Sequence, residues 1–147
     1  MLPERPVQQE NASRSDAILR GLAAMPTMPY GSPVAMRFVL GIRWLALCSR
    51  RRHDPVAELT TRLGSVTAAK AFLDFADLAG AYWPEPVQVL RPCCMAMTPD
   101  ESIFADMARA AASNDRAAFS ATLDGFIRAD RHERLFDAAV EAFAYSS

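Results

Sequence analysis

Four sulfur side chains lie within five residues of one another in the segment RPCCMAMTPDE, residues 91–101. Cys93 and Cys94 offer two thiols, while Met95 and Met97 offer two thioethers. Soft ligands of this kind suit Cu(I) or Zn, and an accessible thiol with a depressed pKa can sense oxidants. The segment therefore indicates either a thiol-based metal or redox site at the two cysteines, or sulfur side chains that serve as core filler.

The spacing of the sulfur residues favours core filler. Structural zinc sites use ligand pairs two to four residues apart with a second pair elsewhere, whereas Cys48, His53 and His132 each stand alone in the sequence. Free cysteine is usually buried and inert, and methionine fills irregular gaps in cores. We therefore expect the sulfur segment to lie tucked under helices, with no cofactor bound, and both histidines to lie at the surface.

A short basic cluster stands in the segment SRRRHD, residues 49–54. Arg50, Arg51 and Arg52, together with Arg43 one or two turns earlier on the same expected helix, could hold a phosphate or a carboxylate through bidentate hydrogen bonds. Arginines near the carboxyl end of a helix also complement its dipole while they stay in water. This second interpretation is the stronger one, because a short basic run without a recognised nucleic-acid-binding module says little about function.

Recognisable catalytic motifs are absent from the sequence. It has no glycine-rich phosphate loop, no H-E-x-x-H, no G-x-S-x-G and no C-x-x-C. The most apolar stretch, residues 34–48, is shorter than the roughly 20 residues that a spanning helix needs, and it contains Arg37 and Arg43. The sequence therefore leans against an enzyme, without deciding the question, and favours a buried central helix over a membrane segment.

The composition is that of one soluble globular domain. The chain has 147 residues, 51% of them hydrophobic and 22% charged, with a net charge of -1. Near-neutral charge argues against a general attraction to nucleic acid or anionic membranes. Because the first residues lack the apolar run of a secretory signal and three cysteines do not suggest a disulfide framework, we expect a cytoplasmic protein.

Proline-led caps divide the chain into helices. Ser32-Pro33, Asp54-Pro55 and Thr98-Pro99 each place a capping side chain before a proline at the first helical position. Thr98 and Glu101 also form a capping box, as do Asp130 and Glu133 in our interpretation. Apolar positions at helical spacing predict helices over residues 16–25, 33–50, 55–63, 66–82, 99–111, 115–128 and 130–144.

No segment alternates at period two, so we expect no sheet. We expect residues 84–97 to form an ordered loop. The short extended piece VQVL within it has no strand to pair with. The sequence also predicts a flexible tail over residues 1–14. A single all-α domain follows over residues 15–147, a compact orthogonal bundle of six or seven short helices.

The order Pro92, Cys93, Cys94, followed by Met-Thr-x-x-Glu, resembles a segment of a small family of uncharacterised bacterial helical proteins, a domain of unknown function. Those proteins also have an arginine-punctuated apolar helix upstream and an alanine-rich C-terminal half, so the resemblance covers about residues 16–144. It implies no activity, and it carries over only Pro92, Cys93, Cys94 and Thr98. Met-Ala-Met after the cysteine pair departs from the expected third cysteine or arginine, which further weakens a metal site.

These features favour a non-catalytic protein-interaction or regulatory domain that binds a protein partner or forms a homodimer. A thiol-based metal or redox sensor at Cys93 and Cys94 is the first alternative. Phosphate or nucleic-acid binding through Arg43 and Arg50–Arg52 is the second, with nucleic acid the least favoured partner. We expect no membrane partner.

Overall fold

The computed structural model describes residues 25–145, which form six α-helices and no strand. The all-α prediction is therefore confirmed for this part of the chain. The expected tail and the helix expected over residues 16–25 lie outside the described residues, apart from Met25, which is not helical. The helices are α2 (Pro33–Arg51), α3 (Pro55–Leu63), α4 (Val66–Tyr82), α5 (Pro99–Ala112), α6 (Arg116–Leu123) and α7 (Ala129–Ala144).

Side-chain caps start five of these helices, because a capping oxygen satisfies a backbone N–H that has no partner within the helix. The capping box before α5 is complete: Glu101 N–H donates to Thr98 Oγ1 (3.0 Å), and Thr98 N–H donates to Glu101 Oε1 (2.9 Å). The caps before the other four helices are Ser32, Asp54, Ser65 and Asp115.

The last two helices differ from the prediction. α6 ends at Leu123 rather than continuing to residue 128, because the chain turns at Gly125, whose φ of +89° suits glycine alone. Arg128, which precedes α7, donates to Asp130 at 3.1 Å. The capping box predicted at Asp130 is also wrong, since α7 begins at Ala129 without a side-chain cap.

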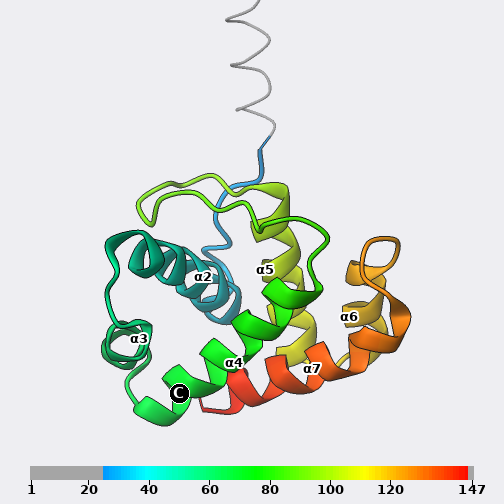
Figure 1. The fold of residues 1–147 in the computed structure, drawn as a ribbon. Coiled ribbons are helices and arrows are strands. Elements are labelled where there is room, and N and C mark those ends of the chain that lie inside the picture. The colour runs from blue at the N-terminus through cyan, green and yellow to red at the C-terminus, as the bar shows by residue number, and fades with distance from the viewer. Residues whose placement is uncertain (1–24, 146–147) are drawn as a thin grey trace, which may run out of the picture.

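The helices pack in crossing pairs. α4 lies against α3 and α7, while α2 lies against α5, which also touches α6 and α7 (Figure 1). A cluster of phenylalanine rings fills the centre, where Phe38 meets Phe72 edge-on with ring centroids 5.5 Å apart. At Gly41 of α2 a Cβ atom would lie only 2.4 Å from Phe72 Cζ, so the missing side chain lets the Phe72 ring from α4 lie against α2. No helix among residues 25–145 has the length and apolar character that crossing a membrane requires.

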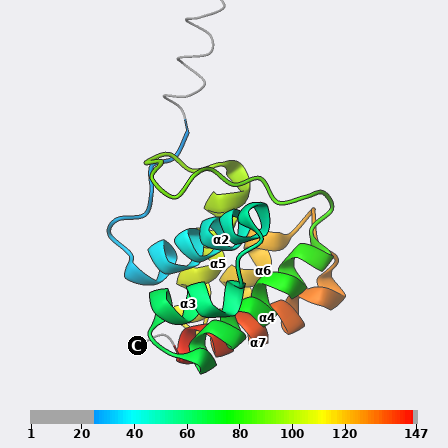
Figure 2. The ribbon, with the colours of Figure 1, turned by 60° about the vertical axis from the view of Figure 1, so that its left-hand side comes forward.

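Residues 84–97, here called the connector, run over one end of the bundle between α4 and α5 (Figures 1 and 2). The proline-rich segment before α2 pairs with the connector through an isolated antiparallel bridge between Thr27 and Ala96. Met28 N–H donates to the carbonyl oxygen of Met95, and Met97 N–H donates to that of Pro26, both at 2.7 Å. The segment that the sequence marks only as a break in the helices therefore helps to hold the connector.

Candidate functional site

Arg43 is fully buried beneath the connector. Its Nε and Nη2 atoms donate to Glu101 at 2.5 and 3.0 Å. Its Nη1 donates to the carbonyl oxygens of Arg91 (3.2 Å) and Cys94 (2.7 Å), and Nη2 donates also to that of Ala96 (2.7 Å). These bonds use all five N–H donors of the guanidinium. Arg43 therefore has no donor left for a solvent anion, which removes it from the predicted anion-binding group.

Glu101 connects the same network to the start of α5. Beyond the capping box and Arg43, its Oε2 accepts a hydrogen bond from Leu90 N–H at 3.4 Å. Thr98 Oγ1 donates in turn to the carbonyl oxygen of Gln88 at 2.6 Å. The capping box is visible in the sequence, but its tie to an arginine 58 positions away is not. The buried Arg43–Glu101 pair thus binds the connector both at residues 90–91 and at residues 94–96.

The sulfur segment is more open than expected. Met97 is 4% exposed and packs in the core, as predicted, whereas Met95 is 67% exposed and Cys93 is exposed as well. Cys94 is half-buried. Arg43 binds the backbone carbonyls of this segment, and the Cys93 and Met95 side chains reach solvent. The expectation that the whole segment lies tucked inside is therefore wrong for these two residues.

No group of three His, Cys, Asp or Glu side chains within residues 25–145 is arranged to hold a metal ion. A metal site at Cys93 and Cys94 thus has only those two thiols and the neighbouring thioethers to offer. Cys48 is buried inside α2, and desolvation, followed by the Glu58 and Asp54 carboxylates, raises the pKa of its thiol. Cys48 is for that reason a packing residue rather than a nucleophile.

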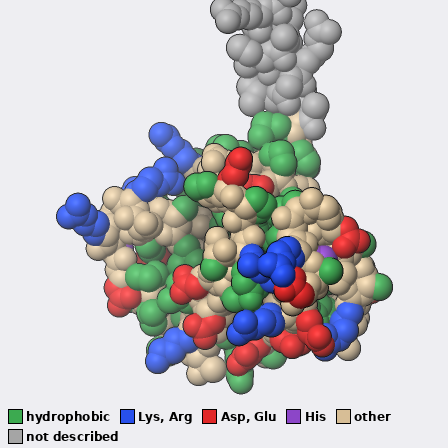
Figure 3. All heavy atoms as spheres, turned by 45° about the vertical axis from the view of Figure 1, so that its right-hand side comes forward, with side chains coloured by type: hydrophobic (Ala, Val, Ile, Leu, Met, Phe, Trp, Pro, Cys, Tyr) green, Lys and Arg blue, Asp and Glu red, His purple; other side chains and the backbone are tan. Residues whose placement is uncertain are grey.

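The rest of the basic cluster lies at the surface. Arg50, Arg51 and Arg52 are exposed at the carboxyl end of α2, where Arg52 serves as the C-cap with a φ of 54°. Their position agrees with the helix-dipole interpretation, and anion binding by them stays a prediction. On the face in Figure 3, acidic and basic side chains are interspersed, without one broad field of a single sign.

The two histidines differ in their surroundings. His53 is exposed, as expected. His132 is only 5% exposed, and its Nε2 lies 2.8 Å from the carbonyl oxygen of Ile127, so the prediction that it lies at the surface is wrong. This buried imidazole of α7 therefore ties the helix to the turn that precedes it.

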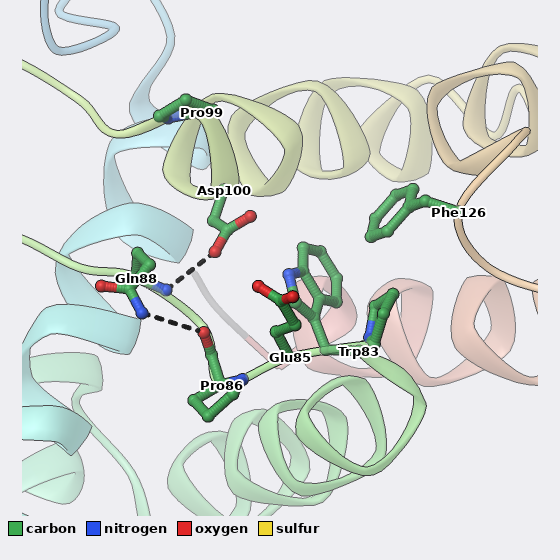
Figure 4. Close-up of a pocket in the computed structure, with 8 residues that line it drawn as sticks. Trp83, Glu85, Pro86, Gln88, Pro99, Asp100 and Phe126 are labelled. Carbon is green, nitrogen blue, oxygen red and sulfur yellow. Dashed lines mark hydrogen bonds between the residues drawn. The ribbon is translucent and has the colours of Figure 1, made fainter.

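A pocket of about 320 Å³ opens where the connector leaves α4 (Figure 4). Four separate parts of the chain build it: the end of α4, the first half of the connector, the start of α5 and the turn between α6 and α7. Its lining is apolar with a few polar groups, the usual character of a binding pocket. The lining residues are Trp83, Pro84, Glu85, Pro86, Gln88, Pro99, Asp100 and Phe126.

Trp83 is the fixed wall of this pocket. Its indole stacks on Phe104 with centroids 4.6 Å apart and meets Phe126 edge-on at 4.9 Å. The residue is 8% exposed, yet no hydrogen bond of its Nε1–H is found among the described residues. In Figure 4 the indole nitrogen faces the side on which Glu85 and Asp100 lie.

Two carboxylates border the same space. Asp100 accepts a hydrogen bond from Gln88 N–H through Oδ2 at 2.8 Å. Glu85 is exposed, and no hydrogen bond or ion pair of its side chain is found among residues 25–145. The sequence patterns did not indicate this pocket. Its one local signal is the segment WPEP at residues 83–86, where an aromatic residue ends a helix and an acid stands between two prolines.

Comparisons of the chain with protein-family models, curated proteins and solved structures find no match. The resemblance of residues 92–101 to the uncharacterised bacterial family consequently stays a prediction.

Proposed function

We propose that this chain is a non-catalytic, cytoplasmic protein-interaction domain, and that the connector is its contact surface. One observation carries the proposal. On its inner side the connector is bound by the fully buried Arg43–Glu101 pair, whereas on its outer side Met95 is 67% exposed. The backbone is fixed from inside while an apolar side chain is presented to solvent.

The buried pair supports this proposal because stability alone does not require it. Desolvating two charges offsets much of their attraction, and apolar replacements of similar volume are often neutral or stabilising. Arg43 also binds three carbonyl groups of the connector. We infer that the pair is there to give the connector one defined shape, which lowers the entropy lost when a partner binds.

The exposed side chains around the connector support a protein partner. Tyr30 is 63% exposed, and it follows the segment that is hydrogen-bonded to Met95 through Met28. Tyrosine and methionine are both enriched at protein interfaces. In Figure 3, apolar side chains gather at the end of the globule next to the grey atoms.

Photo-crosslinking from Cys93 tests the proposal. A benzophenone maleimide on Cys93, in a Cys94→Ser background, should give one defined adduct in cells, either with a second copy of the chain or with a partner. Val66 is an exposed apolar residue on α4, so Val66→Cys in a Cys93→Ser/Cys94→Ser background is a matched control that should give none. Light scattering separates the homodimer from the other partners. Equal labelling from both positions, or a strict monomer without any adduct, would contradict the proposal.

A thiol-based metal or redox sensor is the second candidate, favoured by the exposure of Cys93. Its test is elemental analysis of protein purified without oxygen, combined with the rate of thiol alkylation at neutral pH. Bound metal, or a Cys93 much more reactive than free cysteine, would support a sensor. The absence of metal together with ordinary or slow alkylation would exclude it.

A further inference from the structure

We propose that the pocket beside Trp83 receives a cationic side chain of the partner protein, arginine in preference to lysine. The inference rests on the proposed function, because Pro84, Glu85, Pro86 and Gln88 of the pocket belong to the connector. The inference specifies which side chain of the partner the connector recognises.

The free acceptors of the pocket indicate a cation. Glu85 forms no ion pair with any described residue, and the Oδ1 atom of Asp100 accepts no hydrogen bond from the described residues, since Gln88 N–H binds Oδ2. None of the lining residues is Lys or Arg. Both carboxylates extend toward the space that the aromatic rings border (Figure 4). A guanidinium suits this arrangement better than an ammonium, because its planar fork can donate to two carboxylates at once.

The indole of Trp83 indicates a peptide rather than a free cation. No described residue accepts a hydrogen bond from its N–H, and no buried side-chain nitrogen or oxygen among the described residues lacks a partner. The Trp83 N–H is therefore reached by solvent through the pocket and is open to an acceptor that enters it. Packing against Phe104 and Phe126 holds the ring in place, so the N–H cannot turn away. A main-chain carbonyl next to the inserted arginine would accept that hydrogen bond.

The walls and the volume of the pocket suit one long side chain. Three prolines and Phe126 offer apolar surface to the methylene stem of an arginine, which packs well on such surface while its charged end stays polar. A volume of about 320 Å³ lies at the lower end of the roughly 300–1,000 Å³ range of ligand pockets. This volume is sufficient for one long side chain.

The two carboxylates do not contribute equally. Asp100 stands in the first turn of α5, where the positive end of the helix dipole offsets part of its charge. Glu85 lies outside any helix and has no such neighbour. Glu85 should accordingly provide most of the attraction, and Glu85→Gln is the sharper test.

The experiment is a titration of the ¹⁵N-labelled full-length protein with N-acetyl-arginine amide, observed at the indole N–H resonances. The chain has two tryptophans, so Trp44, which lies under the Arg62 guanidinium, is the internal reference. We expect the Trp83 resonance to shift and saturate while that of Trp44 does not. Glu85→Gln should weaken the binding about fivefold, as for a charge-assisted hydrogen bond in a partly exposed site. Glu141→Gln, the same change at an exposed position on α7, should not.

N-acetyl-citrulline amide, which has nearly the same shape without the charge, separates charge recognition from simple filling of the pocket. An equal response to both amides, or no response of Trp83 to either one, would overturn the proposal. So would an effect of Glu141→Gln as large as that of Glu85→Gln. Crosslinking from Cys93 does not depend on these results, so the pocket can fail while the connector still binds a partner.

Discussion

At the scale of single residues, Arg43 is the side chain whose role changes most between sequence and structure. As an arginine on a helix that leads to a basic cluster, it is one of four candidate anion-binding residues in the sequence, although solvated arginines at a helix end are the stronger interpretation there. In the fold it binds Glu101 and three carbonyl groups of the connector, and it is fully buried. All of its hydrogen-bond donors are used within the protein. Replacing Arg43 should therefore lower the stability of the fold rather than weaken the binding of a ligand.

Arg43→Met should lower the free energy of unfolding by about 3–5 kcal/mol, because Glu101 is left buried without its partner. Glu101→Gln keeps the size of the side chain and one acceptor for Thr98 N–H, and should cost less. Arg109→Met is the matched control, since Arg109 forms an exposed pair with Asp106 worth less than about 1 kcal/mol. Urea denaturation followed by circular dichroism measures all three. Equal losses for Arg43→Met and Arg109→Met would show that the buried pair is not structural.

Cys48 should make stability depend on pH at the alkaline end. Desolvation and the Glu58 and Asp54 carboxylates raise the pKa of its thiol in the folded state above the usual 9.0. The folded protein therefore keeps a proton that the unfolded chain releases, so this contribution is complete below pH 9.0 and is lost as pH rises through the raised pKa. Urea unfolding at pH 7 and above pH 9 should show a smaller decline for Cys48→Ala than for the wild type. Identical declines would contradict the prediction.

At the scale of helices, local chemistry explains where most of them begin. Ser32, Asp54 and Thr98 cap α2, α3 and α5 as predicted, because the capping side chain and the helix it starts are neighbours in the sequence. The predictions fail after Leu123, where the apolar spacing continues but Gly125 turns the chain. Phe126 thereby leaves the helix and becomes a wall of the pocket.

The two glycines within the helices of residues 25–145, Gly41 and Gly80, should respond in opposite directions to alanine. In Gly41→Ala the new Cβ would lie 2.4 Å from Phe72 Cζ, and overpacking of this kind costs about 1–3 kcal/mol. In Gly80→Ala on α4 nothing lies within 4 Å of the new atom, and the higher helix propensity of alanine should add up to about 1 kcal/mol. Thermal unfolding of the two variants is the measurement. A change of the same sign in both would show that the Phe72 ring does not lie tightly against Gly41.

At the scale of the whole molecule, the connector and residues 25–30 form one unit at one end of the bundle. Met28 and Met97 donate hydrogen bonds across the two segments, and Arg43 holds the connector from α2. The contact surface and the Trp83 pocket both belong to this end, whereas α7 lies against α4. Loosening the connector should consequently change this end without changing the distant helix.

Hydrogen exchange should detect that unit. Arg43→Lys keeps a positive charge, but an ammonium cannot serve Glu101 and three carbonyl groups together. Exchange at the amides of Met28, Cys94 and Met97, which are hydrogen-bonded in the native structure, should become faster, while that of Ala139 in α7 should not. Equal acceleration at all four amides would indicate a general loss of stability rather than a loosened connector.

The sequence by itself determined the all-α class and the start of most helices, because a capping residue, a proline and an apolar stripe act on chain neighbours. It did not reveal the partner of Arg43, which stands 58 positions away, nor that Cys93 faces solvent. It also gave no sign that Trp83, Asp100 and Phe126 line one pocket. Only the tertiary structure decided these points, since burial and long-range pairing depend on how the helices cross, and the connector takes its shape from them.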